Sequence, residues 1–134
     1  MNPAPYIGLP FADRGRGPEA FDCWGLYRWV LRREWGVALP SYAEDYPSAL
    51  ELAEVAALIR RESLVWGAVP RGGERPGDMV VLRLRGDPWH VGLITEPGWM
   101  LHIHRRTDSI HERYDSTLWR HRVQHIQRPP QLCG

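Results

Sequence analysis

The chain has 134 residues, of which 43% are hydrophobic and seven are tryptophan, and this composition predicts a single compact domain over residues 1–134. A net charge of +1 argues against a nucleic acid or an anionic membrane surface as a partner held by bulk electrostatics. No apolar stretch approaches the roughly 18 residues that a transmembrane helix needs, so we expect no membrane insertion.

The first six residues, MNPAPY, have neither the charged start nor the apolar run of a secretion signal. We therefore expect the chain to be made in the cytoplasm, where its two cysteines, Cys23 and Cys133, stay reduced. Cys133 is next to the last residue, and we expect it to be a passive thiol.

Two helices are predicted in the first half of the chain. Asp22 is a suitable N-cap for a helix over residues 23 to about 33, with apolar residues recurring on one face and Gly36 ending it. Residues 48–51 have capping-box spacing, and apolar residues recur at helical spacing up to the arginine pair at 60–61. The two prolines between residues 37 and 47 predict an irregular crossing between the helices.

After residue 64 the pattern changes to short strands separated by turns. The clearest strands are residues 79–84, 90–95 and 99–104, and their tight connections predict an antiparallel meander. A turn or short helix near 115–120 and a closing strand near 123–128 follow. The expected fold class is α+β, with N-terminal helices packed on an antiparallel sheet of about five to six strands.

Cys23 is the candidate nucleophile, because a helix start supplies partial positive charge and backbone N–H groups that favour a thiolate. The alternative for this residue is an ordinary packing role in the core. The adjacent carboxylate of Asp22 slightly opposes thiolate formation. The histidines further along the chain favour the nucleophile.

His90 is the candidate general base, at the start of an apolar strand, and its alternative is an ordinary strand-edge histidine. Gly92, two residues later, leaves room for another group to approach. His102 lies on the next strand, where it is predicted to be a cross-strand neighbour of His90. A neutral histidine there would orient the base through its second nitrogen, as the third member of a thiol triad.

Four short motifs resemble those of the NlpC-type cysteine peptidases, which are papain-like peptidoglycan hydrolases. They are Asp-Cys-Trp-Gly-Leu at 22–26, Pro-Gly-Asp at 76–78, His-Val-Gly-Leu-Ile at 90–94 and Met-Leu-His-Ile at 100–103. The resemblance covers residues 6 to 129 and implies a papain-like fold with Cys23, His90 and His102 as the catalytic triad. It also implies no metal and no cofactor, and a peptidoglycan stem peptide as substrate, typically cut between D-glutamate and the diamino acid.

Two positions depart from the pattern of free-standing bacterial members. Trp24 replaces a serine after the nucleophile, and Phe11 replaces an upstream tyrosine that helps to line the oxyanion site. The oxyanion would then be stabilised by backbone N–H groups, chiefly that of Cys23, or by the hydroxyl of Tyr6. Trp24 and Trp89 are candidates for the walls of the substrate cleft, with burial in the core as the alternative.

The Asp-Cys-Trp-Gly-Leu version is similar to members encoded with bacteriophage tails and gene transfer agents. Without a secretion signal, a wall hydrolase needs a carrier, and a tail particle that acts at the cell wall or periplasm would provide one. The expected partners are therefore tail-tip or baseplate hub proteins. A second hypothesis is a structural tail-tip or assembly component with the same fold and little or no catalysis, whose tryptophans serve as interface anchors.

A zinc site is a third interpretation, because several histidines fall in the second half of the chain. Two share a strand face, one follows, and the last two would be four apart on a helix: His102, His104, His111, His121 and His125. We favour a solvated surface for the last four of these. Asp78 is expected to be a turn residue before a strand.

Overall fold

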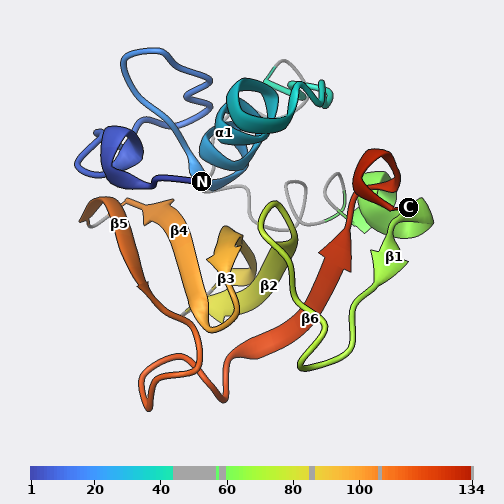
Figure 1. The fold of residues 1–134 in the computed structure, drawn as a ribbon. Helices are drawn as coiled ribbons and strands as arrows, with labels where there is room; N and C mark the ends of the chain where they lie inside the picture. Colours follow the sequence, from blue (N-terminus) through green and yellow to red (C-terminus); the bar gives the residue numbers. More distant parts are fainter. Residues whose placement is uncertain (44–56, 58–59, 85–86, 106, 134) are drawn as a thin grey trace.

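The computed structural model describes residues 1–43, 57, 60–84, 87–105 and 107–133 (Figure 1). The predicted second helix, residues 48–61, lies largely outside the described residues, although Ala57 and residues 60–62 are helical. Among the described residues, the other named helical segments are α1 (Cys23–Trp35) and three 3-10 helices, at Ala4–Tyr6, Ser63–Val65 and Pro130–Leu132. Within the described ranges, no helix is both long and apolar enough to cross a membrane.

Helix α1, Cys23–Trp35, begins where the sequence predicts and ends two residues beyond the expected last residue. The side chain of Asp22 accepts a hydrogen bond of 2.7 Å from the backbone N–H of Gly25, which is the predicted N-cap. Gly36 ends the helix in the left-handed conformation, with φ of 68°. The capping therefore fixes Cys23 as the first residue of the helix.

A tight loop lies against the start of α1 and explains the glycine that follows Trp24. A Cβ atom on Gly25 would lie 1.8 Å from the carbonyl oxygen of Gly15, so no larger residue fits there. Arg16 in the same loop donates a hydrogen bond of 2.8 Å to Asp22 and another to the carbonyl of Ser41. The loop thereby supplies a cation beside the buried carboxylate that caps the helix.

In the described part of the chain the sheet has six strands: β1 (Gly67–Ala68), β2 (Met79–Leu84), β3 (Asp87–Glu96), β4 (Trp99–His104), β5 (Thr107–Arg113) and β6 (Val123–Arg128). All neighbouring strands are antiparallel, in the order β1-β6-β2-β3-β4-β5. The predicted meander is β2-β3-β4, and the closing strand is β6, with the expected bounds. The α+β prediction is confirmed, whereas β1 and β5 were not predicted.

The two faces of the sheet have separate cores. Helix α1 and the N-terminal segment lie on one side of the curved sheet (Figure 1), where α1 packs on alternating strand residues such as Val91, Leu93 and Leu101. The opposite face carries Ile94 and Met100, covered by Tyr114 and Trp119 from the segment between β5 and β6. Alternating residues of one strand therefore pack in two different hydrophobic cores.

Asp78 forms a buried ion pair, in addition to its predicted place before strand β2. Its buried carboxylate accepts two hydrogen bonds of 2.8 Å from the guanidinium of Arg128, at the end of β6. The preceding Gly77 accepts a hydrogen bond of 2.7 Å from the hydroxyl of Tyr27 in α1. The Pro-Gly-Asp motif therefore ties the start of β2 to both β6 and the helix.

The helix cap predicts a stability difference between two variants of Asp22. Asp22→Ala removes the cap and the carboxylate partner of Arg16, and we expect it to lower the free energy of unfolding by about 2–4 kcal/mol. Asp22→Asn keeps an acceptor for the N–H of Gly25, so its loss should be smaller. Urea unfolding followed by tryptophan fluorescence measures both, with exposed Asp108→Ala as control. Equal losses in the two Asp22 variants would contradict this account of the cap.

Candidate active site

Two buried imidazoles meet on the sheet face that α1 does not cover. Nε2 of His90 lies 2.7 Å from Nδ1 of His102, and each residue is only 1% exposed. The Cβ of an alanine at Gly92 would lie 3.3 Å from the Cβ of His102, so the glycine leaves room for this contact. The predicted pairing of the two histidines across β3 and β4 is confirmed.

Glu112 of β5 extends this contact into a chain of three side chains. Its Oε2 lies 2.6 Å from Nε2 of His102, and its side chain is 28% exposed. Register explains the contact: Glu112 pairs with Met100, so it lies diagonally across from His102 on the same face. The chain runs from the buried His90 to a carboxylate that reaches solvent.

Trp119 covers the histidine pair. The centroid of its ring lies 5.2 Å from that of His102 and 6.3 Å from that of His90. On the indole, the guanidinium carbon of Arg122 lies 5.6 Å from the ring centroid. The indole N–H has no acceptor within hydrogen-bond distance among the described residues, yet it is near enough to Glu112 to help lower the pKa of that carboxyl. The indole therefore excludes water from the imidazoles.

Burial and neighbouring charge set the protonation of this chain. Burial, followed by repulsion from the imidazoles of His102 and His104, holds the pKa of His90 well below its ordinary value. The hydrogen bond from His102 is the main cause that lowers the pKa of Glu112. At neutral pH, His90 is consequently neutral and Glu112 is a carboxylate.

Cys23 comes from the other layer of the fold. It is half-buried as the first residue of α1, packs against the core beneath the helix and is not in a disulfide. Its backbone N–H precedes the first intrahelical hydrogen bonds, and the helix dipole favours a thiolate there. The structure thus places the predicted nucleophile at the helix start, while its contact with His90 stays a prediction.

Tyr6 is not at the start of the helix, contrary to the role considered for its hydroxyl. That hydroxyl donates a hydrogen bond of 2.6 Å to Glu34, in the last turn of α1. Glu34 follows Cys23 by eleven residues, which is roughly 16 Å along the axis at 1.5 Å per residue. The hydrogen bond to Glu34 therefore holds the hydroxyl away from a tetrahedral oxyanion at Cys23.

The other three predicted cleft residues have different surroundings. Phe11 is half-buried and its backbone bridges to Phe21, two residues before Cys23. Trp24 is 1% exposed, and its indole N–H donates to the carbonyl of Pro40, so it is a core residue. The backbone of Trp89 lies in β3, and its side chain is outside the described part. A place in the substrate cleft stays a prediction for Phe11 and Trp89, whereas the burial of Trp24 corresponds to the alternative given for it.

The histidines proposed for zinc point to separate partners. His111 contacts the hydroxyl of Thr95 at 2.8 Å, and His121 is an exposed turn residue beside Arg120. His125 is on strand β6, so the helical spacing that would align it with His121 does not occur. Over the described ranges, no three metal-binding side chains gather in a group that could hold an ion.

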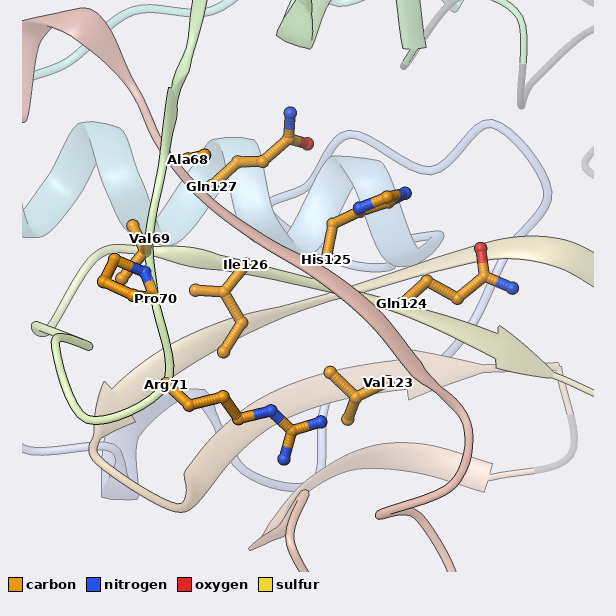
Figure 2. Close-up of a pocket in the computed structure, with 9 residues that line it drawn as sticks. All are labelled: Ala68, Val69, Pro70, Arg71, Val123, Gln124, His125, Ile126 and Gln127. Carbon is orange, nitrogen blue, oxygen red and sulfur yellow. The ribbon is translucent and has the colours of Figure 1, made fainter.

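A hollow of about 320 Å³ lies elsewhere, between β6 and the segment that follows β1 (Figure 2). Its lining is mixed apolar and polar: Ala68, Val69, Pro70, Arg71, Val123, Gln124, His125, Ile126 and Gln127. None of the three predicted triad residues lines it.

Comparison with known proteins indicates the same family as the sequence motifs. Residues 8–128 match the NlpC/P60 family. The chain belongs to this family. The tail tip assembly protein K of Escherichia phage N15 is 29% identical over 99 residues, which are 70% of this chain. This NlpC/P60 chain spans 39% of the length of that curated relative.

Solved structures confirm the papain-like α+β fold of the family. An NlpC/P60 family protein from Bacillus cereus has a TM-score of 0.66 at 16% identity, covering 92% of this chain and 36% of that chain. The NlpC/P60 domain of the peptidoglycan hydrolase SagA has a TM-score of 0.63 at 16% identity, covering 94% and 92%. At these identities the likeness shows the fold alone.

The buried His90 predicts how the stability of this NlpC/P60 domain varies with pH. Because the folded-state pKa of His90 is lowered, the unfolded chain binds more protons below about pH 6.5. The free energy of unfolding should fall from pH 7.5 to 5.5, by up to about 1.4 kcal/mol per pH unit for this group. Glu112 does not contribute in this range, because the pKa of its carboxyl is lowered from an ordinary value of about 4.5. Its protonation therefore changes the free energy of unfolding only below about that pH.

Urea unfolding at pH 7.5, 6.5 and 5.5 measures this slope. His90→Gln should reduce the slope, because one titrating group is gone while His111, whose pKa is also lowered by burial, remains. The exposed His121→Gln is the control. The same slope in the wild-type protein and His90→Gln would show that the burial of His90 is not linked to stability.

Proposed function

We propose that the protein is a cysteine endopeptidase that cuts the stem peptide of peptidoglycan, at the bond between D-glutamate and the diamino acid. The observation that carries this proposal is the placement of the candidate triad residues in a chain of the NlpC/P60 family. A cysteine begins its helix α1, and the contacting pair His90 and His102 is buried on neighbouring strands. The order of these residues along the chain matches that of a thiol triad.

The reaction begins with transfer of the Cys23 thiol proton to His90. The thiolate sulfur then attacks the carbonyl carbon of the scissile peptide, a C–S bond forms, and the carbonyl electrons move to oxygen. The neutral state of His90 at physiological pH suits this step, since only a neutral imidazole accepts a proton. His102 holds the imidazole of His90 in place through their 2.7 Å contact.

The second half of the reaction returns every group to its starting state. The tetrahedral intermediate collapses, the C–N bond breaks, and His90 gives its proton to the departing amine. Water, activated by the same histidine, hydrolyses the thioester into a carboxylic acid and the Cys23 thiol. The oxyanion in both steps is stabilised by backbone N–H groups, chiefly that of Cys23, since Phe11 has no hydroxyl. No metal or cofactor takes part.

A phage-like tail is the proposed setting for this activity. The similarity to tail tip assembly protein K of phage N15 supports this, as does the Asp-Cys-Trp-Gly-Leu sequence around the nucleophile. A chain made in the host cytoplasm would be incorporated into the tail by contacts with tail-tip or baseplate hub proteins. The tail would then bring the enzyme to the wall of the next cell.

The same similarity favours a second candidate function, a structural tail component with little or no hydrolysis. The name of the phage N15 relative, tail tip assembly protein K, describes assembly and no enzymatic activity. In that case the Cys23→Ala protein would assemble into tails and support infection as well as the wild-type protein does. The two candidates therefore differ in whether the thiol is needed.

Mass spectrometry of purified muropeptides tests the endopeptidase directly. The wild-type protein should release a cut stem peptide, and Cys23→Ala should reduce the rate by more than about a thousandfold, because the nucleophile is absent. Cys133→Ser is the matched control, since this exposed thiol has no proposed role and the variant should cut normally. Intact muropeptides with the wild-type protein, alone and in assembled tails, would favour the structural component.

A further inference from the structure

We propose that Glu112 is a fourth member of the site, a positioning residue that fixes the tautomers of both histidines and makes Nδ1 of His90 the atom that accepts the proton. This inference rests on the proposed function. It concerns a residue on β5, a strand that the sequence did not predict. This residue contacts neither substrate nor Cys23 in the proposed reaction.

The first step of the argument is the contact between Glu112 and His102. A carboxylate only accepts hydrogen bonds, so the 2.6 Å contact places a hydrogen on Nε2 of His102. The lowered pKa of Glu112 keeps it in the carboxylate form across neutral pH. When His102 is neutral, as its proposed role in the triad requires, the carboxylate therefore selects the tautomer with hydrogen on Nε2.

The second step passes this choice to His90. In the selected neutral tautomer, Nδ1 of His102 carries a lone pair and can only accept. The 2.7 Å contact then requires Nε2 of His90 to donate its hydrogen. A neutral His90 has one remaining ring nitrogen, Nδ1, and its lone pair is available for the thiol proton.

The third step concerns the charge that develops during the reaction. When His90 takes a proton, a cation forms among side chains that are almost fully buried, which is costly without a nearby negative charge. The titratable or charged groups around it are His102 and His104 of β4, Glu112 of β5 and, across the indole of Trp119, Arg122. Among these described groups Glu112 is the carboxylate, and together with the thiolate that forms at Cys23 in the same step it offsets the developing charge, acting through His102.

The ¹⁵N chemical shifts of histidine-labelled protein test the tautomers without any substrate. In the wild-type protein at neutral pH, we expect both His90 and His102 to carry hydrogen on Nε2. Glu112→Ala removes the acceptor, and His102 should then populate the other tautomer. Glu112→Gln keeps an oxygen acceptor and should retain the wild-type tautomers. Asp108→Asn, an exposed change on the same strand, is the control and should not alter the shifts.

The pH dependence of Cys23 alkylation by iodoacetamide tests the effect on reactivity, in a Cys133→Ser background so that one thiol reacts. We expect Glu112→Ala to slow alkylation and muropeptide cleavage by about tenfold and to shift the pH profile, with partial rescue in Glu112→Gln. Thermal unfolding shows whether each variant is folded. Glu112→Ala with wild-type tautomers and a wild-type pH profile would overturn the proposal.

Failure of this inference differs from failure of the proposed function. If the wild-type protein cuts no muropeptide but Glu112→Ala changes the tautomers, the endopeptidase proposal fails and the role of Glu112 in setting the tautomers stands. If the wild-type protein cuts muropeptides and Glu112→Ala leaves the tautomers and rates unchanged, the role of Glu112 is wrong and the endopeptidase stands.

Discussion

The buried contact between His90 and His102 constrains most of what surrounds it. Two imidazoles that are 1% exposed need hydrogen-bond partners for their ring nitrogens, because an unsatisfied buried polar group costs about 1–3 kcal/mol. Strands β3 and β4 provide the first contact, and β5 provides the carboxylate that ends the chain at the surface. Trp119 closes the same face against water. The sheet order β3-β4-β5 is thus also the order of the hydrogen-bond chain.

Much of this could be predicted from the sequence because the signals are local. The cap by Asp22, the end of α1 at Gly36 and the bounds of β2, β4 and β6 each depend on a few neighbouring residues. The pairing of His90 with His102 also followed from local evidence, since a short turn between two strands brings residues twelve apart into contact.

The parts that could not be predicted depend on contacts between distant segments. Strand β5 has mixed burial without regular alternation, so its pattern gave no strand signal and Glu112 was overlooked. Trp119 lies in a turn, and only the packing of the segment after β5 shows that it covers the histidines. The hydroxyl of Tyr6 was considered for the oxyanion site, and its actual partner, Glu34, is 28 residues away.

The N-terminal segment connects the two layers from which the candidate site is built. Its backbone pairs with the edge strand β5 at Ser109, where Gly8 donates to the carbonyl of Ser109 and Leu9 accepts from its N–H. The hydroxyl of Ser109 adds a hydrogen bond of 2.6 Å to the carbonyl of Tyr6. A few residues later, the backbone of Phe11 bridges to Phe21, immediately before Asp22 and Cys23.

One short stretch of chain therefore contacts both the strand that carries Glu112 and the residue that precedes the capped start of α1, where the candidate nucleophile lies. An edge strand without such a partner has unsatisfied backbone groups and is free to shift its register. A one-residue shift of β5 would turn Glu112 to the other face of the sheet and remove the carboxylate from His102. The register of an edge strand, held by residues far from the thiol, thus determines whether the histidine chain has its terminal acceptor.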